Sequence, residues 1–425
     1  MAFRAVKGMN DVLSNDSPRW QRLERAFQRQ ARLYGYEEVR TPVVEHTDLF
    51  VRSIGEVTDV VEKEMYSFQH HRDALTLRPE GTAGATRAYV EHKVYARETV
   101  TRWYYLGPMF RAERPQRGRY RQFYQAGCEI YGDPGPVADA EMIDMLVGLF
   151  RQLGIGELQV AINSLGGSAT RQRYREALTE YFTPQVGALS AHAQERLGKN
   201  PLRILDSKDP KDQAVAAGAP SMLDVLDDAD REHFDGLKRA LDALETPYVV
   251  EPRLVRGLDY YTRTSFEIRS EAGELGAQNT LAGGGRYDNM VEELGGPATP
   301  AIGFAMGLER ILLAMPESAA ADRAGCYIMP LGSAALPKAL TIAREVRARG
   351  VRVECDGRGQ SLKSQMRRAD SLGMRACIVL GEDELSRGVV QLKDLEKHTQ
   401  REVSFTEIAE QVRALCTVSA EAGGA

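Results

Sequence analysis

Apolar residues at helical spacing mark the first long element of the chain. Between polar Arg, Glu and Gln side chains stand Trp20, Leu23, Phe27 and Ala31. Their intervals of three and four residues predict an amphipathic helix over 17–34 with one buried face. Gly35 is a typical helix stop, since glycine takes a positive φ without strain. The run that follows, 36–43, predicts a strand, and its Pro42 is typical of a strand edge or end.

Two aromatic and β-branched runs, 100–110 and 121–131, predict the strands of a long hairpin. A helix is predicted over 138–153, and 301–315 begins glycine-rich and becomes helical. The further strands expected in this part of the chain are 158–162, 262–270 and 278–282.

The composition shifts between 168 and 246, where Arg, Glu, Ala and Leu dominate. Helical patterns recur there over 169–182, 188–197 and 221–244. Because strand patterns resume at Tyr248, we interpret this segment as a helical insertion in the first domain.

After a linker rich in Pro, Ala and Ser at 316–323, strand and helix patterns alternate. The expected strands are 326–330, 351–355, 376–380 and 389–393, and the expected helices are 336–349, 362–372 and 406–415. This alternation predicts a separate small α/β domain over 325–415, followed by a flexible tail at 416–425. The domain holds 15 Lys and Arg against 12 Asp and Glu, whereas the whole chain has a net charge of −5.

Composition excludes several classes of protein. A hydrophobic content of 43% and a charged content of 27% over 425 residues are typical of a globular protein. The five cysteines are scattered without a C-x-x-C pair, which argues against a disulfide framework or zinc ribbon and favours reduced thiols in the cytoplasm. No uncharged apolar run approaches the ~18 residues of a membrane span. The first residues also lack the apolar core of a secretory signal.

Common phosphate and metal motifs are missing from the sequence. It contains no P-loop, no dinucleotide fingerprint, no G-x-S-x-G elbow and no H-x-x-x-H pair. We therefore assign no metal ligand among the protein side chains.

The predicted hairpin carries five arginines and one glutamate between residues 110 and 123. Arginine presents a permanent, planar charge that suits phosphate, although most such turns are simply solvated. Arg111 ends an apolar strand, where its charge needs Glu113 or a bound anion as a partner. On these residues alone, a phosphate site and a solvated basic turn remain equally good interpretations.

Two further clusters each allow two interpretations. Glu80 and Thr82 flank Gly81 and can hold an ammonium group, but a plain helix cap explains Glu80 better on its own. Arg256 precedes Tyr260 and Tyr261, which suits either a cationic site with a phenolic hydroxyl or an edge strand with one core tyrosine.

Two glycine-rich segments complete the set. Residues 282–288 read Ala-Gly-Gly-Gly-Arg-Tyr-Asp, and 303–310 read Gly-Phe-Ala-Met-Gly-Leu-Glu-Arg. Glycines permit a close approach of backbone to a ligand, but also a tight turn. Arg310 lies within the predicted helix, where it either faces a ligand or pairs with a carboxylate of the sheet.

The order of these segments carries more information than any one of them. The arginine-rich hairpin and the segment ending in Gly-Leu-Glu-Arg resemble motifs 2 and 3 of class II aminoacyl-tRNA synthetases, and 17–42 resembles motif 1. Within that class, 256–262 and 283–288 resemble the two signature peptides of the histidyl-tRNA synthetase family. The resemblance covers about 7–415. Two departures are Lys7 to Asp11, where many relatives have Thr-Arg before the Asp, and Tyr124, where His is frequent.

This resemblance implies a fold and a domain organisation. It implies an α+β catalytic domain with an antiparallel sheet over 1–320, interrupted by the helical insertion at 168–246. It also implies that 325–415 is an α/β anticodon-binding domain. Motif 1 implies a homodimer.

The resemblance also implies an activity and its participants. L-histidine and ATP would give histidyl-adenylate and pyrophosphate, and the histidyl group would pass to the 3′ end of tRNA(His). Arg111 and Arg256 would hold the α-phosphate, and Arg256 also the substrate carboxylate. Arg310 would contact the γ-phosphate or adenine, Glu113 would lie near the adenine amino group, and Mg²⁺ would bridge the β- and γ-phosphates.

The same resemblance assigns the histidine and tRNA contacts. The residues matched to the α-ammonium are Glu80, Thr82 and Gln125. Glu129 and Tyr261 match the ligands of the two imidazole nitrogens, with Tyr260 beside them, so a ringless amino acid would leave Glu129 unpaired. The hairpin residues expected at the tRNA acceptor end are Arg114, Gln116, Arg117 and Arg119.

Three other functions stay open at this point. A regulatory subunit of a histidine-biosynthetic phosphoribosyltransferase shares the catalytic fold but generally lacks the C-terminal domain and the arginines. A synthetase for glycine, threonine or proline would not explain 256–262 and 283–288. A general α/β binding protein would leave five ordered motifs unexplained.

Overall fold

The computed structural model describes residues 3–55, 58, 60–205, 207–254, 258, 260–272, 275, 279–316 and 323–417. The chain divides into two compact units, Met1–Pro316 and Glu317–Ala425. No helix within these described ranges is long and apolar enough to cross a membrane.

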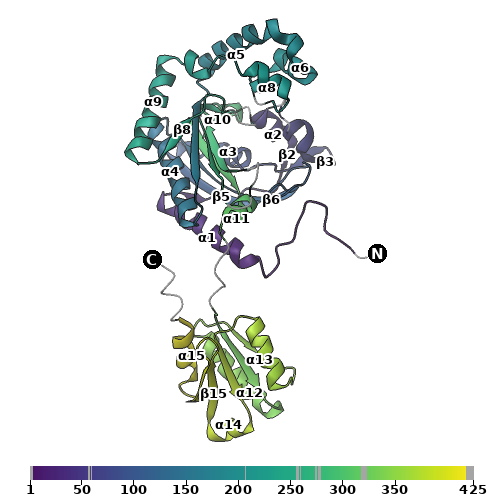
Figure 1. The fold of residues 1–425 in the computed structure, drawn as a ribbon, viewed down its shortest axis with the longest axis vertical. Helices are drawn as coiled ribbons and strands as arrows, with labels where there is room; N and C mark the ends of the chain where they lie inside the picture. The colour runs from purple at the N-terminus through teal and green to yellow at the C-terminus, as the bar shows by residue number, and fades with distance from the viewer. Residues whose placement is uncertain are drawn as a thin grey trace. The chain divides into compact units, whose positions relative to one another are not determined.

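An eight-stranded sheet forms the centre of the first unit (Figure 1). Its strands lie in the order β1 (Glu37–Glu38), β5 (Thr101–Phe110), β6 (Gln122–Tyr131), β11 (Ala301–Gly307), β10 (Thr280–Arg286), β9 (Thr262–Ser270), β7 (Leu158–Ser164) and β8 (Tyr248–Val250). Neighbours from β5 to β7 are antiparallel, and β1 and β8 join the two edges in parallel. The predicted antiparallel sheet and its long hairpin, β5–β6, are confirmed.

Three helices cover one face of this sheet: α1 (Ser17–Leu33), α4 (Pro136–Gln152) and α9 (Asp228–Ala243). Helix α1 buries Leu23, Phe27 and Ala31, as their spacing predicts. Helix α4 is buried on most sides because it packs against α1, α9 and the sheet.

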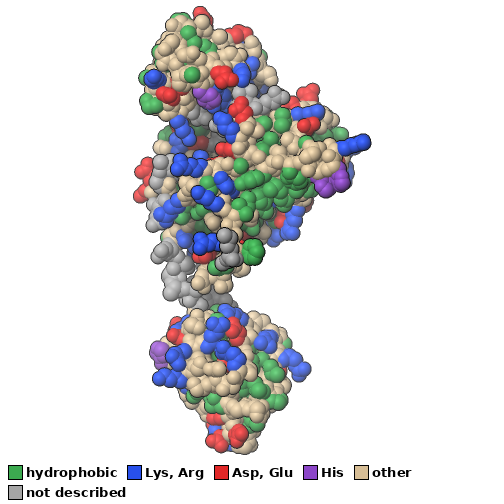
Figure 2. Space-filling view, turned by 90° about the vertical axis from the view of Figure 1, so that its right-hand side faces the viewer, with side chains coloured by type: hydrophobic (Ala, Val, Ile, Leu, Met, Phe, Trp, Pro, Cys, Tyr) green, Lys and Arg blue, Asp and Glu red, His purple; other side chains and the backbone are tan. Residues whose placement is uncertain are grey.

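The other face of the sheet carries α3 (Thr82–Glu91) and a small antiparallel sheet in the order β2 (Val44–His46), β4 (Asp73–Leu77) and β3 (Tyr66–His70). Strand β3 is largely exposed, including Phe68, and so is Val44 of β2. Figure 2 shows hydrophobic side chains gathered on this side of the first unit.

The segment with a helical composition forms α5 (Ser168–Phe182), α6 (Ala191–Lys199), α7 (Leu202–Leu205), α8 (Pro210–Ala216), a short 3₁₀ turn (Met222–Val225) and α9. The single helical pattern expected over 221–244 is wrong. Two caps break it: the Ser221 side chain caps the 3₁₀ turn, and the Asp227 side chain accepts the backbone N–H of Asp230 at the start of α9.

Other boundaries in the first unit also differ from expectation. Of the strand expected over 36–43, only β1 forms a regular strand, consistent with Pro42, which lacks an N–H donor. Strand β10 continues through the glycines to Arg286. The segment expected to become helical contains β11 before the short helix α11 (Leu308–Ala314).

The second unit is a five-stranded sheet with helices, as the alternating pattern predicts. Its strands lie in the order β13 (Val353–Cys355), β12 (Cys326–Pro330), β14 (Ala376–Leu380), β15 (Val389–Asp394) and β16 (Thr399–Ser404). Its helices are α12 (Leu336–Arg347), α13 (Leu362–Ser371), α14 (Glu382–Arg387) and α15 (Ile408–Thr417). Strands β13, β12 and β14 are parallel, and β15 and β16 continue antiparallel. Sequence reasoning missed β16 because it is a polar edge strand with one buried residue, Val403.

A fully buried ion pair joins the large sheet to its helix layer. The Arg286 guanidinium at the end of β10 lies 2.7 Å from the Asp139 carboxylate of α4, and neither side chain has exposed surface. Other Arg286 donors reach the carbonyl oxygens of Asp133 and Gly135, while His233 of α9 lies 2.9 Å from Asp139. Burial alone would raise the pKa of Asp139, but Arg286 and His233 together hold it below its usual range.

Replacing Arg286 with Met should lower the free energy of unfolding by about 3–5 kcal/mol, because Asp139 would keep a buried charge without its partner. Urea unfolding followed by circular dichroism measures the loss. Arg40→Met is the matched control, since Arg40 pairs with Glu38 at the surface and exposed pairs contribute little. Equal losses in the two variants would contradict a special role for the buried pair.

Candidate active site

A cavity of about 360 Å³ lies over the face of the large sheet that the helix layer leaves open. Strand alternation explains its polar lining: Ala126, Cys128 and Ile130 of β6 point into the core, so Gln125 and Glu129 point the other way. Small residues of β10 and β11 leave room for a ligand, namely Ala282, Gly283, Ala305 and Gly307.

Most residues singled out from the sequence line this cavity. They are Glu80, Thr82, Arg111, Glu113, Arg119, Gln125, Tyr260, Tyr261 and Arg310. Glu129 is fully buried and hydrogen-bonds to Thr82, a lining residue. Arg256 lies outside the described residues. The hairpin residues Arg114, Gln116 and Arg117 are exposed, whereas Arg119, grouped with them from the sequence, faces the cavity.

Arg111 is held so that its charge faces the cavity. Its Nε donates to the carbonyl oxygen of Pro79 at 2.9 Å, and its guanidinium lies over the Phe123 ring, 5.4 Å from the centroid. Of the two partners considered for Arg111, Glu113 pairs instead with Arg119 at 3.2 Å. No carboxylate in the described ranges forms an ion pair with Arg111. The Arg111 charge is therefore available to a bound anion.

Arg310 extends the same positive region from α11. Its Nε donates to the carbonyl oxygen of Gly118 at 3.2 Å, and Nη1 donates to that of Thr280 at 3.3 Å. Burial lowers the pKa of Arg310, and the nearby charges of Arg119 and Arg111 lower it further. The carboxylates of Glu113 and Glu267 oppose these effects, so guanidinium and carboxylate groups lie together in this region.

A carboxylate and an amide face the opposite part of the cavity. Glu80 accepts the backbone N–H groups of Thr82 and Ala83 at 2.7 and 2.8 Å, and the amide oxygen of Gln125 accepts the N–H of Gly81 at 3.2 Å. Burial raises the pKa of Glu80, and these hydrogen bonds oppose that rise. Glu80 therefore caps the start of α3, and it also lines the cavity.

Glu129 is completely enclosed by hydroxyl groups. One carboxylate oxygen accepts from Thr82 Oγ1 at 2.8 Å and from the Tyr105 hydroxyl at 3.1 Å, and the other accepts from the Tyr287 hydroxyl at 2.5 Å. Burial raises the pKa of Glu129 to about 8, although the hydrogen bonds from Tyr287 and Thr82 lower it. Burial therefore disfavours the charged form of this carboxyl group.

Sequence reasoning missed the roles of Tyr105 and Tyr287. Tyr287 stands inside the glycine-rich segment 282–288, so a signal for it existed. Tyr105 is one of several aromatic residues in β5, and only the face that it occupies distinguishes it. Tyr260 extends this aromatic wall, with its ring centroid 4.5 Å from that of Tyr261 and 5.7 Å from that of Tyr287.

Two further carboxylates at the cavity were also missed, Glu267 and Glu309. Glu309 accepts the backbone N–H of Tyr124 at 2.9 Å, and burial raises its pKa to about 7. The Gly-Leu-Glu-Arg segment contained this residue. No group of three or more His, Cys, Asp or Glu side chains within the described ranges forms a metal site.

The cavity therefore has two chemically different parts. Arg111, Arg119 and Arg310 supply positive charge for an anion such as a polyphosphate. Glu80, Gln125 and the buried Glu129 supply oxygens that suit cationic or N–H groups. The two parts adjoin in one cavity, so a ligand bound in one part can react with a ligand bound in the other.

Comparisons with known proteins agree along the whole chain. The family model described as histidyl-tRNA synthetase matches residues 8–311, and the model described as anticodon binding domain matches 325–415. The histidine–tRNA ligase of Sorangium cellulosum is 60% identical over 424 residues, covering 100% of this chain and 99% of that protein. The corresponding ligase of Bacillus velezensis is 44% identical, covering 97% and 99%.

A solved structure shows the same architecture. The crystal structure of apo histidyl-tRNA synthetase from S. aureus has a TM-score of 0.83 and 33% identity, covering 97% of this chain and 100% of that chain. A Bacillus halodurans structure titled as an ATP phosphoribosyltransferase regulatory subunit/histidyl-tRNA synthetase has a TM-score of 0.66 at 20% identity, covering 90% and 99%, and shows the fold alone.

Gly303→Ala should lower the free energy of unfolding by about 1–3 kcal/mol, because the new Cβ would overlap the Glu129 carboxylate and force it from its hydrogen bonds. Gly307→Ala in the same strand is the control, since no atom of the described residues lies within 4 Å of the place its methyl group would take. Thermal unfolding of both variants measures the difference. Similar melting temperatures would show that Glu129 is not confined by Gly303.

Proposed function

The chain belongs to the histidyl-tRNA synthetase family. From that membership we propose which part of the cavity binds each substrate of a histidine–tRNA ligase. The enzyme activates L-histidine with ATP, giving histidyl-adenylate and pyrophosphate, and then transfers the histidyl group to the 3′ end of its tRNA. The observation that carries the proposal is the joining of an arginine-rich part and a carboxylate-rich part in one cavity.

The arginine-rich part binds ATP. Arg111 contacts the α-phosphate, where the histidine carboxylate attacks and two anions must meet. Arg310 contacts the γ-phosphate or stacks on adenine, and Glu113 lies near the adenine amino group. Arg119 joins this set, because its guanidinium pairs with Glu113 inside the cavity. We assign Arg256 to the α-phosphate and the histidine carboxylate on its match to the family peptide.

The carboxylate-rich part binds histidine. Glu80, Thr82 and Gln125 surround the α-ammonium group. Glu129 and the Tyr261 hydroxyl face the two imidazole nitrogens, which gives each ring nitrogen one partner. Tyr260 packs beside the ring.

Mg²⁺ accompanies ATP in this family, and the residues present fit a shared site rather than a protein cage. Mg²⁺ at such sites takes one or two carboxylates together with phosphate oxygens and waters. Glu267 and Glu309 line the cavity and would supply those carboxylates. When bound, the ion neutralises negative charge on the β- and γ-phosphates.

The tRNA contacts are assigned to two regions. The exposed loop residues Arg114, Gln116 and Arg117 meet the acceptor end. The domain at 325–415, which matches the anticodon-binding model, meets the anticodon through unstacked bases. The catalytic domain then spans 1–320, with its insertion at 168–246 and a tail at 416–425.

We place the enzyme in the cytoplasm as a homodimer. The five cysteines are all free, as expected in a reducing compartment. For the dimer, β1 leaves one edge of the large sheet unpaired, and the small sheet exposes Val44 and Phe68 nearby in the fold. Such exposed apolar surface is typical of an interface.

Histidine-dependent exchange of pyrophosphate with ATP, measured without tRNA across the twenty amino acids, tests this function. Histidine alone should support exchange in the wild type. Glu129→Gln should reduce it by orders of magnitude while ATP still binds, because the imidazole loses its proton-sharing partner. A rate near that of the wild type in Glu129→Gln would remove Glu129 from the imidazole site, and exchange with another amino acid would overturn the assignment of the pocket.

Histidine binding should be tightest between pH values of about 6.5 and 8. The free imidazole has a pKa of about 6.5, and that of Glu129 is about 8. One proton is shared in the complex, so binding releases a proton below this range, where both groups are protonated, and takes one up above it. Calorimetry in buffers of different ionisation enthalpy measures both effects. Proton uptake above pH 8 that persists in Glu129→Gln would contradict this assignment.

A further inference from the structure

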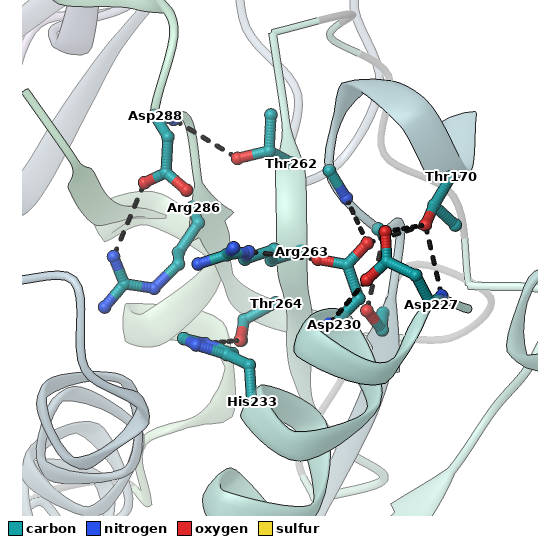
Figure 3. A network of polar contacts seen from close by, with 12 residues as sticks. Thr170, Asp227, Asp230, His233, Thr262, Arg263, Thr264, Arg286 and Asp288 are labelled. Carbon is teal, nitrogen blue, oxygen red and sulfur yellow. Dashed lines mark hydrogen bonds and ion pairs between the residues drawn. The ribbon is translucent and has the colours of Figure 1, made fainter. Parts of the chain in front are cut away.

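At the base of the helical insertion, Asp230 of α9 lies between Arg263 of β9 and Thr170 of α5 (Figure 3). Tyr261 directly precedes β9 in the chain. Asp230, in the first turn of α9, accepts the backbone N–H of Gly167 and the Thr170 hydroxyl, both at 2.7 Å. Its other carboxylate oxygen lies 3.1 Å from Nε of Arg263 in β9. Asp230 is only 2% exposed, so water is largely excluded from these contacts.

The backbone of Arg263 shows that this junction is under constraint. Its φ is +42°, a left-handed conformation that a non-glycine residue keeps only where its surroundings hold it. Its N–H donates to the carbonyl oxygen of Gly166 at 2.9 Å, and its carbonyl oxygen accepts from Leu165 at 2.6 Å. The turn before α5 therefore fixes the main chain at Arg263.

Two more contacts fix the residues on either side. Nη1 of Arg171 in α5 donates to the main-chain carbonyl oxygen of Tyr261 at 3.0 Å. The Thr264 hydroxyl lies 3.3 Å from His233, one turn after Asp230 in α9. Helices α5 and α9 thus hold the chain at 261, 263 and 264.

We propose that Arg171 and Asp230 are positioning residues for the histidine pocket, acting through the main chain of Tyr261. The direction of a side chain follows from its backbone, so releasing the 261–263 segment moves the Tyr261 hydroxyl away from the imidazole. The inference rests on the proposed role of Tyr261. Arg111 and Arg310 of the ATP part lie on the β5–β6 hairpin and α11, which make none of the contacts described above, so the loss should fall mainly on histidine.

Arg171→Gln should raise the KM for histidine about tenfold in pyrophosphate exchange, a typical coupling between contacting residues, and leave the KM for ATP within about twofold. Arg175→Gln, one turn further along α5 and exposed, is the matched control and should behave as the wild type. A general loss of folding would instead raise both KM values or remove active enzyme. An unchanged KM for histidine, or an equal rise in both, would overturn the proposal.

Asp230→Asn tests the second contact in the same assay, with the exposed Asp228→Asn in the same helical turn as its control. It should also raise the KM for histidine selectively, because the neutral side chain loses the charge that pairs with Arg263. Selective loss in Asp228→Asn as well would show a helix-end charge effect and would overturn the role of Asp230.

A double-mutant cycle separates this inference from the function on which it rests. If Arg171 acts through Tyr261, then Arg171→Gln should add little to the effect of Tyr261→Phe. Fully additive effects would overturn the positioning role but leave Tyr261 in the pocket. A normal KM for histidine in Tyr261→Phe alone would overturn both the imidazole assignment and the inference.

Discussion

A buried charge must find all its partners within the protein, and the Arg286–Asp139 pair sets this constraint at the centre of the catalytic unit. Besides Asp288, two residues further along the chain, the partners of Arg286 come from α4 and from the turn before it, which ties the end of β10 to the helix layer. The next residue is Tyr287, whose hydroxyl holds Glu129. The arginine of the glycine-rich peptide is therefore structural, and it supports the polar floor of the histidine pocket from the opposite face of the sheet.

The enclosure of Glu129 changes the argument for selectivity. The expectation that an amino acid without a ring would leave this carboxylate unpaired is wrong, because Thr82, Tyr105 and Tyr287 already satisfy it. Burial raises its pKa and so favours the neutral acid over the charged form. Imidazole can share that proton, whereas an apolar side chain would have to displace the hydroxyl donors without replacing them. On the proposed assignment of Glu129 to the imidazole, discrimination comes from proton sharing rather than from relief of a bare buried charge.

Prediction from sequence succeeded for elements whose residues show a clear local pattern of apolar spacing or an ordered motif. Helix α1 and the β5–β6 hairpin followed from spacing, and Arg111 and Arg310 followed from ordered motifs. Arg119 was grouped with the residues expected at the tRNA acceptor end, because sequence does not show which way a turn folds back over a cavity. Tyr105 was missed because its role depends on strand register, which pairs it with Gly127, two residues from Glu129. Strand β16 was missed because it buries too little to leave an apolar pattern.

In the helical insertion, the residue at which the amino-acid composition changes differs from the residue at which one hydrophobic core gives way to another. The shift in residue usage ends near 246, yet Phe234, Leu237 and Leu241 of α9 belong to the core beneath the large sheet. Helices α5 to α8, in contrast, share a smaller core of their own around Tyr174 and Leu178. Helix α9 is thus part of the catalytic unit although its composition matches the insertion. Helix α9 packs under the sheet, and its Asp230 side chain also pairs with Arg263. A movement of the insertion at this junction would therefore strain the segment that carries Tyr261.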